Sequence, residues 1–162
     1  MYKEIPEKIT KKMKNGKNDA SSLYYYEQLL KKISGNACVY NGFKEFDSEK
    51  LFAVTDYLLK QCKIRYGDDY LVKGIFIKIL WFIETTFFLR KDQALIGLRF
   101  VKFERGPVPE KYNILIDYLK DANIISYKEI DYGNTSQHEL YLKGMREIVG
   151  LTMEEQKVIN DV

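Results

Sequence analysis

The amino-acid sequence predicts an α+β fold that is mostly helical, with a helical core, a small antiparallel hairpin and a winged-helix-like order of elements. Several stretches place apolar residues at three- and four-residue spacing, which is typical of amphipathic helices. Two β-prone runs, 124–130 and 137–142, flank the polar residues 131–136 and predict the hairpin. Hydrophobic residues make up 46% of the 162-residue chain, which is enough to bury one core.

The first 42 residues divide into two predicted units. Residues 1–20 contain six lysines, three acidic residues and few apolar side chains, so we expect a flexible basic arm that either solubilises the chain or contacts phosphate groups. Residues 21–42 are expected to form an N-terminal helix, Ser22 to Ser34, and a lead-in with a tight turn at Asn41-Gly42. The remaining residues, 43–162, are expected to form the main domain.

A long amphipathic helix is predicted next. Asp47 or Ser48 is expected to cap it, and its apolar stripe runs from Leu51 to Cys62 at offsets typical of a helix. Gly67 ends the pattern.

The following helix is expected over residues 70–90, with Asp68-Asp69 as its cap. It is apolar on nearly every side, which indicates packing on more than one face. Lys73, Lys78 and Glu84 interrupt the apolar run, so the sequence does not predict a membrane span.

Two prolines stand two residues apart after a predicted strand over residues 96–103. Proline fixes φ and restricts the residue before it, so Gly106-Pro107-Val108-Pro109 predicts a rigid turn. Pro109 suits the first position of the helix that continues to about Asp121. After the hairpin, Thr152 and Glu155 have the spacing of a capping box and predict a final helix.

Residues that could carry catalysis are few. The single histidine, His138, falls in the second hairpin strand, where a surface or edge role is expected. Cys38 and Cys62 lack metal-ligand spacing and are expected to be small buried residues in a reducing compartment. No glycine-rich phosphate loop or nucleophile motif is present. The sequence therefore predicts a cytoplasmic protein that is not an enzyme and needs no metal or cofactor.

Aromatic residues are the compositional anomaly, at 14% of the chain. Protein interfaces favour such residues. The run Tyr24-Tyr25-Tyr26 cannot place three rings on one buried helix face, so at least one ring is expected to be exposed or to contact a partner. We expect an exposed aromatic patch somewhere in the fold.

Three motifs follow one another at defined spacing. They are Lys78-Ile79-Leu80-Trp81-Phe82-Ile83-Glu84, then Ile96-Gly97-Leu98-Arg99-Phe100-Val101, then Gly106-Pro107-Val108-Pro109 with Tyr112. In this composite the chain resembles the Panacea domain, the SocA-like antitoxin family, which is also known as a phage-associated domain of unknown function. The lead-in Gly42 to Asp47 is similar to the G-F-R-x-F-D segment that precedes the domain in relatives with a DNA-binding module. Phe87 stands where that family commonly has a histidine.

The resemblance implies an antitoxin that binds and neutralises a protein toxin, commonly encoded by an adjacent gene, through a non-catalytic interface. Trp81, Phe82, Glu84, Arg99 and Tyr112 become candidates for either the core or the contact surface. Arg99 is a polar anchor for the partner, or else a surface strand residue or an intramolecular partner of Glu84. Five further motif residues are expected to be structural: Lys78, Gly97, Gly106, Pro107 and Pro109.

Two other classes of function stay open at this level. A winged-helix-like DNA-binding protein or a phage-associated regulatory protein would agree with the element order and the basic arm. However, the helix after the prolines carries Glu110, Asp117 and Asp121 beside only Lys111 and Lys120, which makes a poor face for phosphates. An enzyme would need a cluster of ionisable groups that the sequence does not provide.

Overall fold

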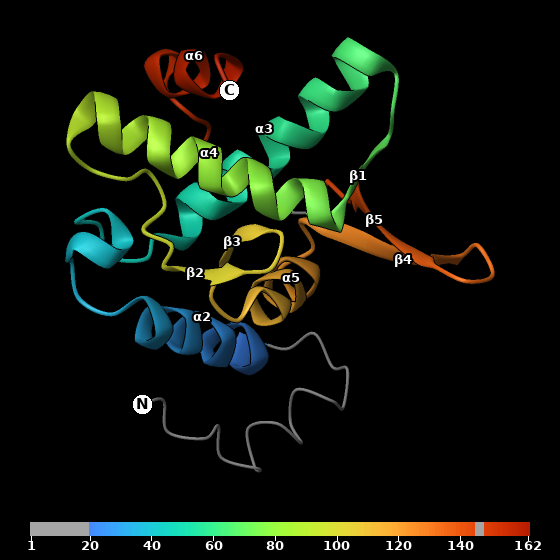
Figure 1. Cartoon of the computed structure of the whole chain (residues 1–162), viewed down its shortest axis with the longest axis horizontal. Coiled ribbons are helices and arrows are strands. Elements are labelled where there is room, and N and C mark those ends of the chain that lie inside the picture. Colours follow the sequence, from blue (N-terminus) through green and yellow to red (C-terminus); the bar gives the residue numbers. More distant parts are fainter. Residues whose placement is uncertain (1–19, 145–147) are drawn as a thin grey trace.

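A computed structural model of the chain describes residues 20–144 and 148–162, so most of the predicted basic arm lies outside the described residues. The fold is α+β and mostly helical, as predicted. Figure 1 shows the elements, which are in chain order α2 (Ala20–Ser34), the 3-10 helix η1 (Val39–Asn41), α3 (Ser48–Tyr66), β1 (Tyr70–Val72), α4 (Lys73–Lys91), β2 (Phe100–Phe103), β3 (Gly106–Pro109), α5 (Tyr112–Asp121), β4 (Ile125–Asp131), β5 (Ser136–Leu142) and α6 (Met153–Asn160).

A three-stranded antiparallel sheet has the order β1-β5-β4. The predicted hairpin is confirmed as β4 and β5, with Ile125 opposite Leu142 and Asp131 opposite Ser136 at its tip. β1 pairs with β5 on the other side and places Leu71 opposite Leu140. The path α3, β1, α4, α5, β4, β5 therefore has winged-helix connectivity, with the hairpin β2–β3 inserted between α4 and α5.

The expected start of α4 at residue 70 is wrong. Residues 70–72 are the strand β1, and the helix begins at Lys73 with Val72 as its N-cap and no side-chain cap. Asp68 and Asp69 precede the strand and do not cap the helix. The sequence of β1, Tyr70-Leu71-Val72, favours a strand. The edge of β5 that does not pair with β4 provides the hydrogen bonds that hold these residues extended.

The proline segment is a strand and not a turn. Gly106–Pro109 forms β3, which pairs with β2 around a two-residue turn at Glu104 and Arg105. In an antiparallel pair, hydrogen-bonded and non-hydrogen-bonded positions alternate, so two prolines spaced by two residues both avoid the positions that must donate. Pro109 is not the first residue of α5 either, because that helix begins at Tyr112 after Lys111 in a left-handed conformation.

α4 supplies the central buried surface. It lies between α6 and the hairpin β2–β3 in Figure 1, and the hairpin packs against it. On the other side of the fold, α2 packs against α5, where the Tyr26 ring lies 6.3 Å from that of Tyr118. The side chains of the core that are almost completely buried include Phe52, Phe76, Leu80, Ile83, Ile96, Leu115, Leu119 and Leu140.

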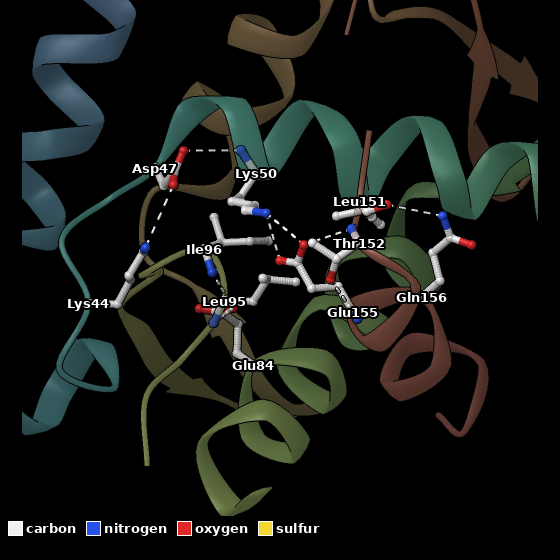
Figure 2. A network of polar contacts seen from close by, with 10 residues as sticks. All are labelled: Lys44, Asp47, Lys50, Glu84, Leu95, Ile96, Leu151, Thr152, Glu155 and Gln156. Atoms are coloured by element: carbon white, nitrogen blue, oxygen red, sulfur yellow. Dashed lines mark hydrogen bonds and ion pairs between the residues drawn. The ribbon is translucent and has the colours of Figure 1, made fainter. Parts of the chain in front are cut away.

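The helix ends follow the predicted capping rules in most places. The Asp47 side chain accepts a hydrogen bond from the backbone N–H of Lys50, 3.1 Å away, and so caps α3. The Thr152 and Glu155 side chains form the predicted capping box at the start of α6. Glu155 also binds the Lys50 ammonium at 2.7 Å, which joins α6 to α3 (Figure 2).

Among the residues that the structure describes, no helix combines the length and the apolar character that a membrane crossing requires. The predicted boundary between residues 42 and 43 stays a prediction.

Candidate functional site

The carboxylate of Glu84 lies in the middle of the candidate motifs and binds only backbone groups. Its Oε1 accepts hydrogen bonds from the N–H groups of Leu95 and Ile96, at 3.0 and 2.7 Å. Its Oε2 accepts from Gly97 and Leu98, at 2.9 and 3.1 Å. Figure 2 shows the side chain rising from α4 toward this segment. Residues 95–98 are the last part of the connection from α4 to β2, and the Glu84 carboxylate holds them in place.

This arrangement explains why the predicted strand over residues 96–103 begins only at Phe100. A strand needs its backbone N–H groups for a neighbouring strand, but those of residues 95–98 donate to Glu84. Two carbonyl groups of the same segment are used elsewhere: Ile96 O accepts from Asp47 N at 2.8 Å, and Gly97 O accepts from the Ser34 hydroxyl.

Gly97 is required at its position for two reasons. Its φ is +88°, a conformation that L-residues rarely adopt. In addition, a Cβ atom there would lie 2.5 Å from the carbonyl oxygen of Lys44 and 2.6 Å from that of Glu45. The lead-in residues 42–47 therefore pass directly over Gly97, and Gly42 O also accepts a hydrogen bond from Ala94 N at 2.8 Å.

Burial raises the pKa of the Glu84 carboxyl, and the four backbone N–H groups that it accepts from lower the pKa in part. The residue is 4% exposed and cannot contact a partner directly. Glu84 is thus a core residue. It also does not pair with Arg99, so that proposed intramolecular contact is wrong: the Arg99 Nε lies 3.3 Å from a carboxylate oxygen of Glu110, and the guanidinium lies 5.1 Å from the ring centre of Tyr40.

The opposite side of α4 exposes large apolar side chains. Ile75, Phe82 and Leu89 are 51%, 55% and 75% exposed, and they follow one another at seven-residue spacing along one line of the helix. We call these three residues the α4 stripe. As predicted, α4 packs against more than one neighbour, since it contacts β1, β3, β5 and α6. Its fully buried side chains, such as Phe76, Leu80 and Phe87, nevertheless share one broad side of the helix, and the line through the α4 stripe stays exposed.

Aromatic rings continue this apolar surface on one flank of α4. Trp81 is half-buried and meets the Phe100 ring edge-on at 5.0 Å, and Phe43 stacks on Phe88 at 6.1 Å. These four residues form the aromatic flank. Of the four rings, Phe43 is exposed and the other three are half-buried, so the exposed aromatic patch expected from composition stays a prediction. The tyrosine run behaves as predicted, with Tyr26 buried and Tyr24 exposed.

Residues 76–162 match the family described as Antitoxin SocA-like, Panacea domain, which covers more than half of the chain. The chain belongs to this family. No curated protein and no solved structure matches it. Within the Panacea domain, the motif residues now separate into a buried support and an exposed surface.

The support of the Panacea domain is the contact of Glu84 with Gly97, and it brings the first two motifs together beneath the lead-in. The third motif, Pro107 and Pro109, forms the strand that flanks Phe100. Gly106 has a φ of +112° and open space where a side chain would go, so it serves the hairpin turn alone.

The surface of the Panacea domain includes two of the candidates for partner contact, the exposed Phe82 and the half-buried Trp81. Lys78, which was expected to be structural, is also exposed. Tyr112 lies apart from them, in contact with Phe103 at 6.4 Å and with the Lys73 ammonium 5.7 Å from its ring centre. Sequence reasoning missed Ile75 and Leu89. Their seven-residue spacing with Phe82 was the available signal.

The groups considered for catalysis are dispersed. The His138 ring stacks on Tyr127 and its Nδ1 shares a hydrogen bond with the Tyr127 hydroxyl. Cys38 and Cys62 are free thiols and only partly buried, which corrects the expectation that both are buried. Residues 20–144 and 148–162 contain no group of three or more side chains placed to hold a metal ion.

Proposed function

We propose that this protein is an antitoxin that binds a partner toxin stoichiometrically, without catalysis, and thereby neutralises it. Membership of the SocA-like antitoxin family implies a toxin as partner. The observation that carries the proposal is the α4 stripe, because Ile75, Phe82 and Leu89 leave one line of a long helix apolar and exposed. Large apolar side chains that gather on one exposed face mark interaction sites on soluble proteins.

Phe82 is the central contact in this proposal and Trp81 borders it. Aromatic residues with apolar surroundings dominate binding energy in protein interfaces. Arg99 is the polar anchor at the edge of the aromatic flank: its side chain is 37% exposed, and its guanidinium is already oriented by Glu110 and Tyr40. Glu84 acts indirectly, by holding the segment that leads to Arg99 and Phe100.

The test uses the reading frame adjacent to the gene for this chain. Its product is expressed in cells with and without the full chain, and growth is followed together with copurification of the two proteins. The proposal expects growth arrest that the chain relieves, and a stable complex of the two. A neighbouring product that is harmless and never copurifies would contradict it.

The winged-helix connectivity favours DNA binding as a second candidate function. In that fold the helix before the final hairpin, here α5, commonly enters the major groove. Two features of α5 oppose this role. α2 packs against it, and the Ser22 hydroxyl donates to the Asp121 carboxylate at 3.0 Å. Burial first, and then the nearby carboxylates of Asp117 and Asp121, raise the pKa of Tyr26 to about 12, so two acidic groups of α5 lie close to α2.

DNA binding by the full chain is distinguishable by salt. Contacts with phosphate groups release counterions, so the association constant would fall steeply between 50 and 200 mM salt by roughly a thousandfold or more. Binding with that dependence, without any protein partner, would favour the second candidate.

A further inference from the structure

The α4 stripe has the geometry of a surface that another helix covers. Apolar residues that repeat every seven positions form one line along a helix, and a coiled-coil seam also has apolar residues between them, at alternating three- and four-residue spacing. In α4 the half-buried Ile79 provides one such position, four residues after Ile75 and three before Phe82. From Ile75 to Leu89 the line extends about 21 Å at the usual rise of 1.5 Å per residue. The side chains between these positions that share the face include Lys78, Thr85 and Thr86, which are short or flexible and leave the line accessible.

The charged residues of α4 are almost all basic. Its basic residues are Lys73, Lys78, Arg90 and Lys91, and its single acidic residue is Glu84, which is buried. Arg90 and Lys91 pair with Asp161 and Glu154 of α6. Lys78 is exposed and lies one helical turn from both Ile75 and Phe82, on the face of α4 that carries the stripe.

We infer that the partner segment covering the α4 stripe is an amphipathic helix with apolar residues at three- and four-residue spacing and acidic residues beside them, one of them facing Lys78. This inference rests on the proposed function and names the part of the toxin that is recognised. Opposite charges across an interface favour the encounter and select the partner. A second copy of this chain fits less well, because α4 offers Lys78 no acidic counterpart: Glu84, the single acidic residue of the helix, is buried.

The inference is tested with two designed helical peptides of about 21 residues, or three heptads. Both carry the same leucines and isoleucines at the apolar positions, and they differ only in having glutamate or lysine at the flanking positions. Each is titrated into the full chain, and the fluorescence of Trp81, the chain's single tryptophan, reports binding beside Phe82. We expect the acidic peptide to bind at least about tenfold more tightly than the basic one.

Two variants make the test specific. Phe82→Asp should abolish binding of the acidic peptide, and Lys78→Glu should reverse the preference between the two peptides. Ile64→Asp is the matched control, because Ile64 is an apolar residue of α3 that is 74% exposed, outside the stripe. It should bind the acidic peptide as the parent chain does.

Three results would overturn the inference: equal binding of both peptides, binding that survives Phe82→Asp, or a dimer of the chain that Phe82→Asp dissociates. Failure of the proposed function would look different. If the adjacent gene product is neutralised and its complex with the chain survives Phe82→Asp, the antitoxin role stands and the helical docking surface is wrong. If the acidic peptide binds as expected but no toxin is neutralised, the surface stands and the antitoxin role is wrong.

Discussion

The Oε2 atom of Glu84 lies 2.9 Å from the backbone nitrogen of Gly97 and joins the middle of α4 to the segment beneath the lead-in. Through this contact a buried charge organises backbone rather than catalysing a reaction. The same helix carries both features: Glu84 lies on the buried face of α4, and Phe82 lies on its exposed face. Substitutions at Glu84 or Gly97 should therefore lower the stability of the fold, whereas substitutions on the α4 stripe should weaken partner binding.

Glu84→Gln is expected to destabilise the fold by about 3 kcal/mol. The amide keeps one acceptor oxygen, and its NH2 group would face two backbone N–H groups, which then stay buried without an acceptor at about 1–3 kcal/mol each. Urea denaturation followed by circular dichroism measures the loss. Glu104→Gln, in the exposed turn of the β2–β3 hairpin, is the control and should change stability by less than about 0.5 kcal/mol. Equal stability of the two variants would contradict the structural role of Glu84.

Gly97→Ala should cost more than Gly106→Ala, although both glycines have positive φ. At Gly106 only the backbone strain opposes a side chain, at about 1 kcal/mol, because no atom lies near the added Cβ. At Gly97 the same strain adds to a clash with the Lys44 and Glu45 carbonyl groups, and we expect about 3 kcal/mol or more. Thermal unfolding of the two variants side by side measures the difference. The reverse order would show that the lead-in does not pass over Gly97.

The attachment of α6 should weaken in acid because of Glu155. Burial alone would raise the pKa of this carboxyl, but the Lys50 ammonium and the hydrogen bonds with Thr152 outweigh burial and hold the pKa below its ordinary value of 4.5. A lowered folded pKa contributes stability that is present above 4.5 and is lost as the pH falls through the folded pKa.

Unfolding free energies of the parent chain and of Glu155→Gln, measured between pH 7 and pH 3, test this sign. The parent should lose its advantage over the variant as the pH falls. An advantage that grows in acid would mean that burial, and not Lys50, determines the titration of Glu155.

Replacing both Pro107 and Pro109 by alanine should have a small effect, about 1 kcal/mol or less for each residue. The strand β3 does not require proline, and the loss comes from greater freedom of the unfolded chain. Partner binding should persist. Denaturation and copurification together check this, and a double variant that does not fold would mean that the prolines define the backbone path after all.

The elements that sequence predicted well are those with strong local signals. The caps of α3 and α6, the hairpin β4–β5 and the apolar face of α5 depend on residues close in the chain. β1 could not be predicted, because its three residues become a strand only through distant β5. Likewise, residues 96–98 were predicted as the start of a strand, but a carboxylate from α4 takes their N–H groups.

The candidate site was predicted in part. Motif residues were identified, but their division into support and surface depends on which side of α4 meets the core. A helix apolar on nearly every side does not reveal that side. Glu84 indicates it in retrospect, since the one acidic residue of α4 lies on the buried face with Leu80 and Phe87.

The central claim is that the exposed face of α4 binds the toxin, and the most direct measurement is the affinity of Phe82→Asp for the adjacent gene product by isothermal titration. We expect at least about a hundredfold loss, as for a central aromatic contact. The free energy of unfolding should stay within about 0.5 kcal/mol of the parent, as for an exposed position. Ile64→Asp should bind normally. A Phe82→Asp variant that is folded and binds the toxin within a factor of about two of the parent would contradict the claim.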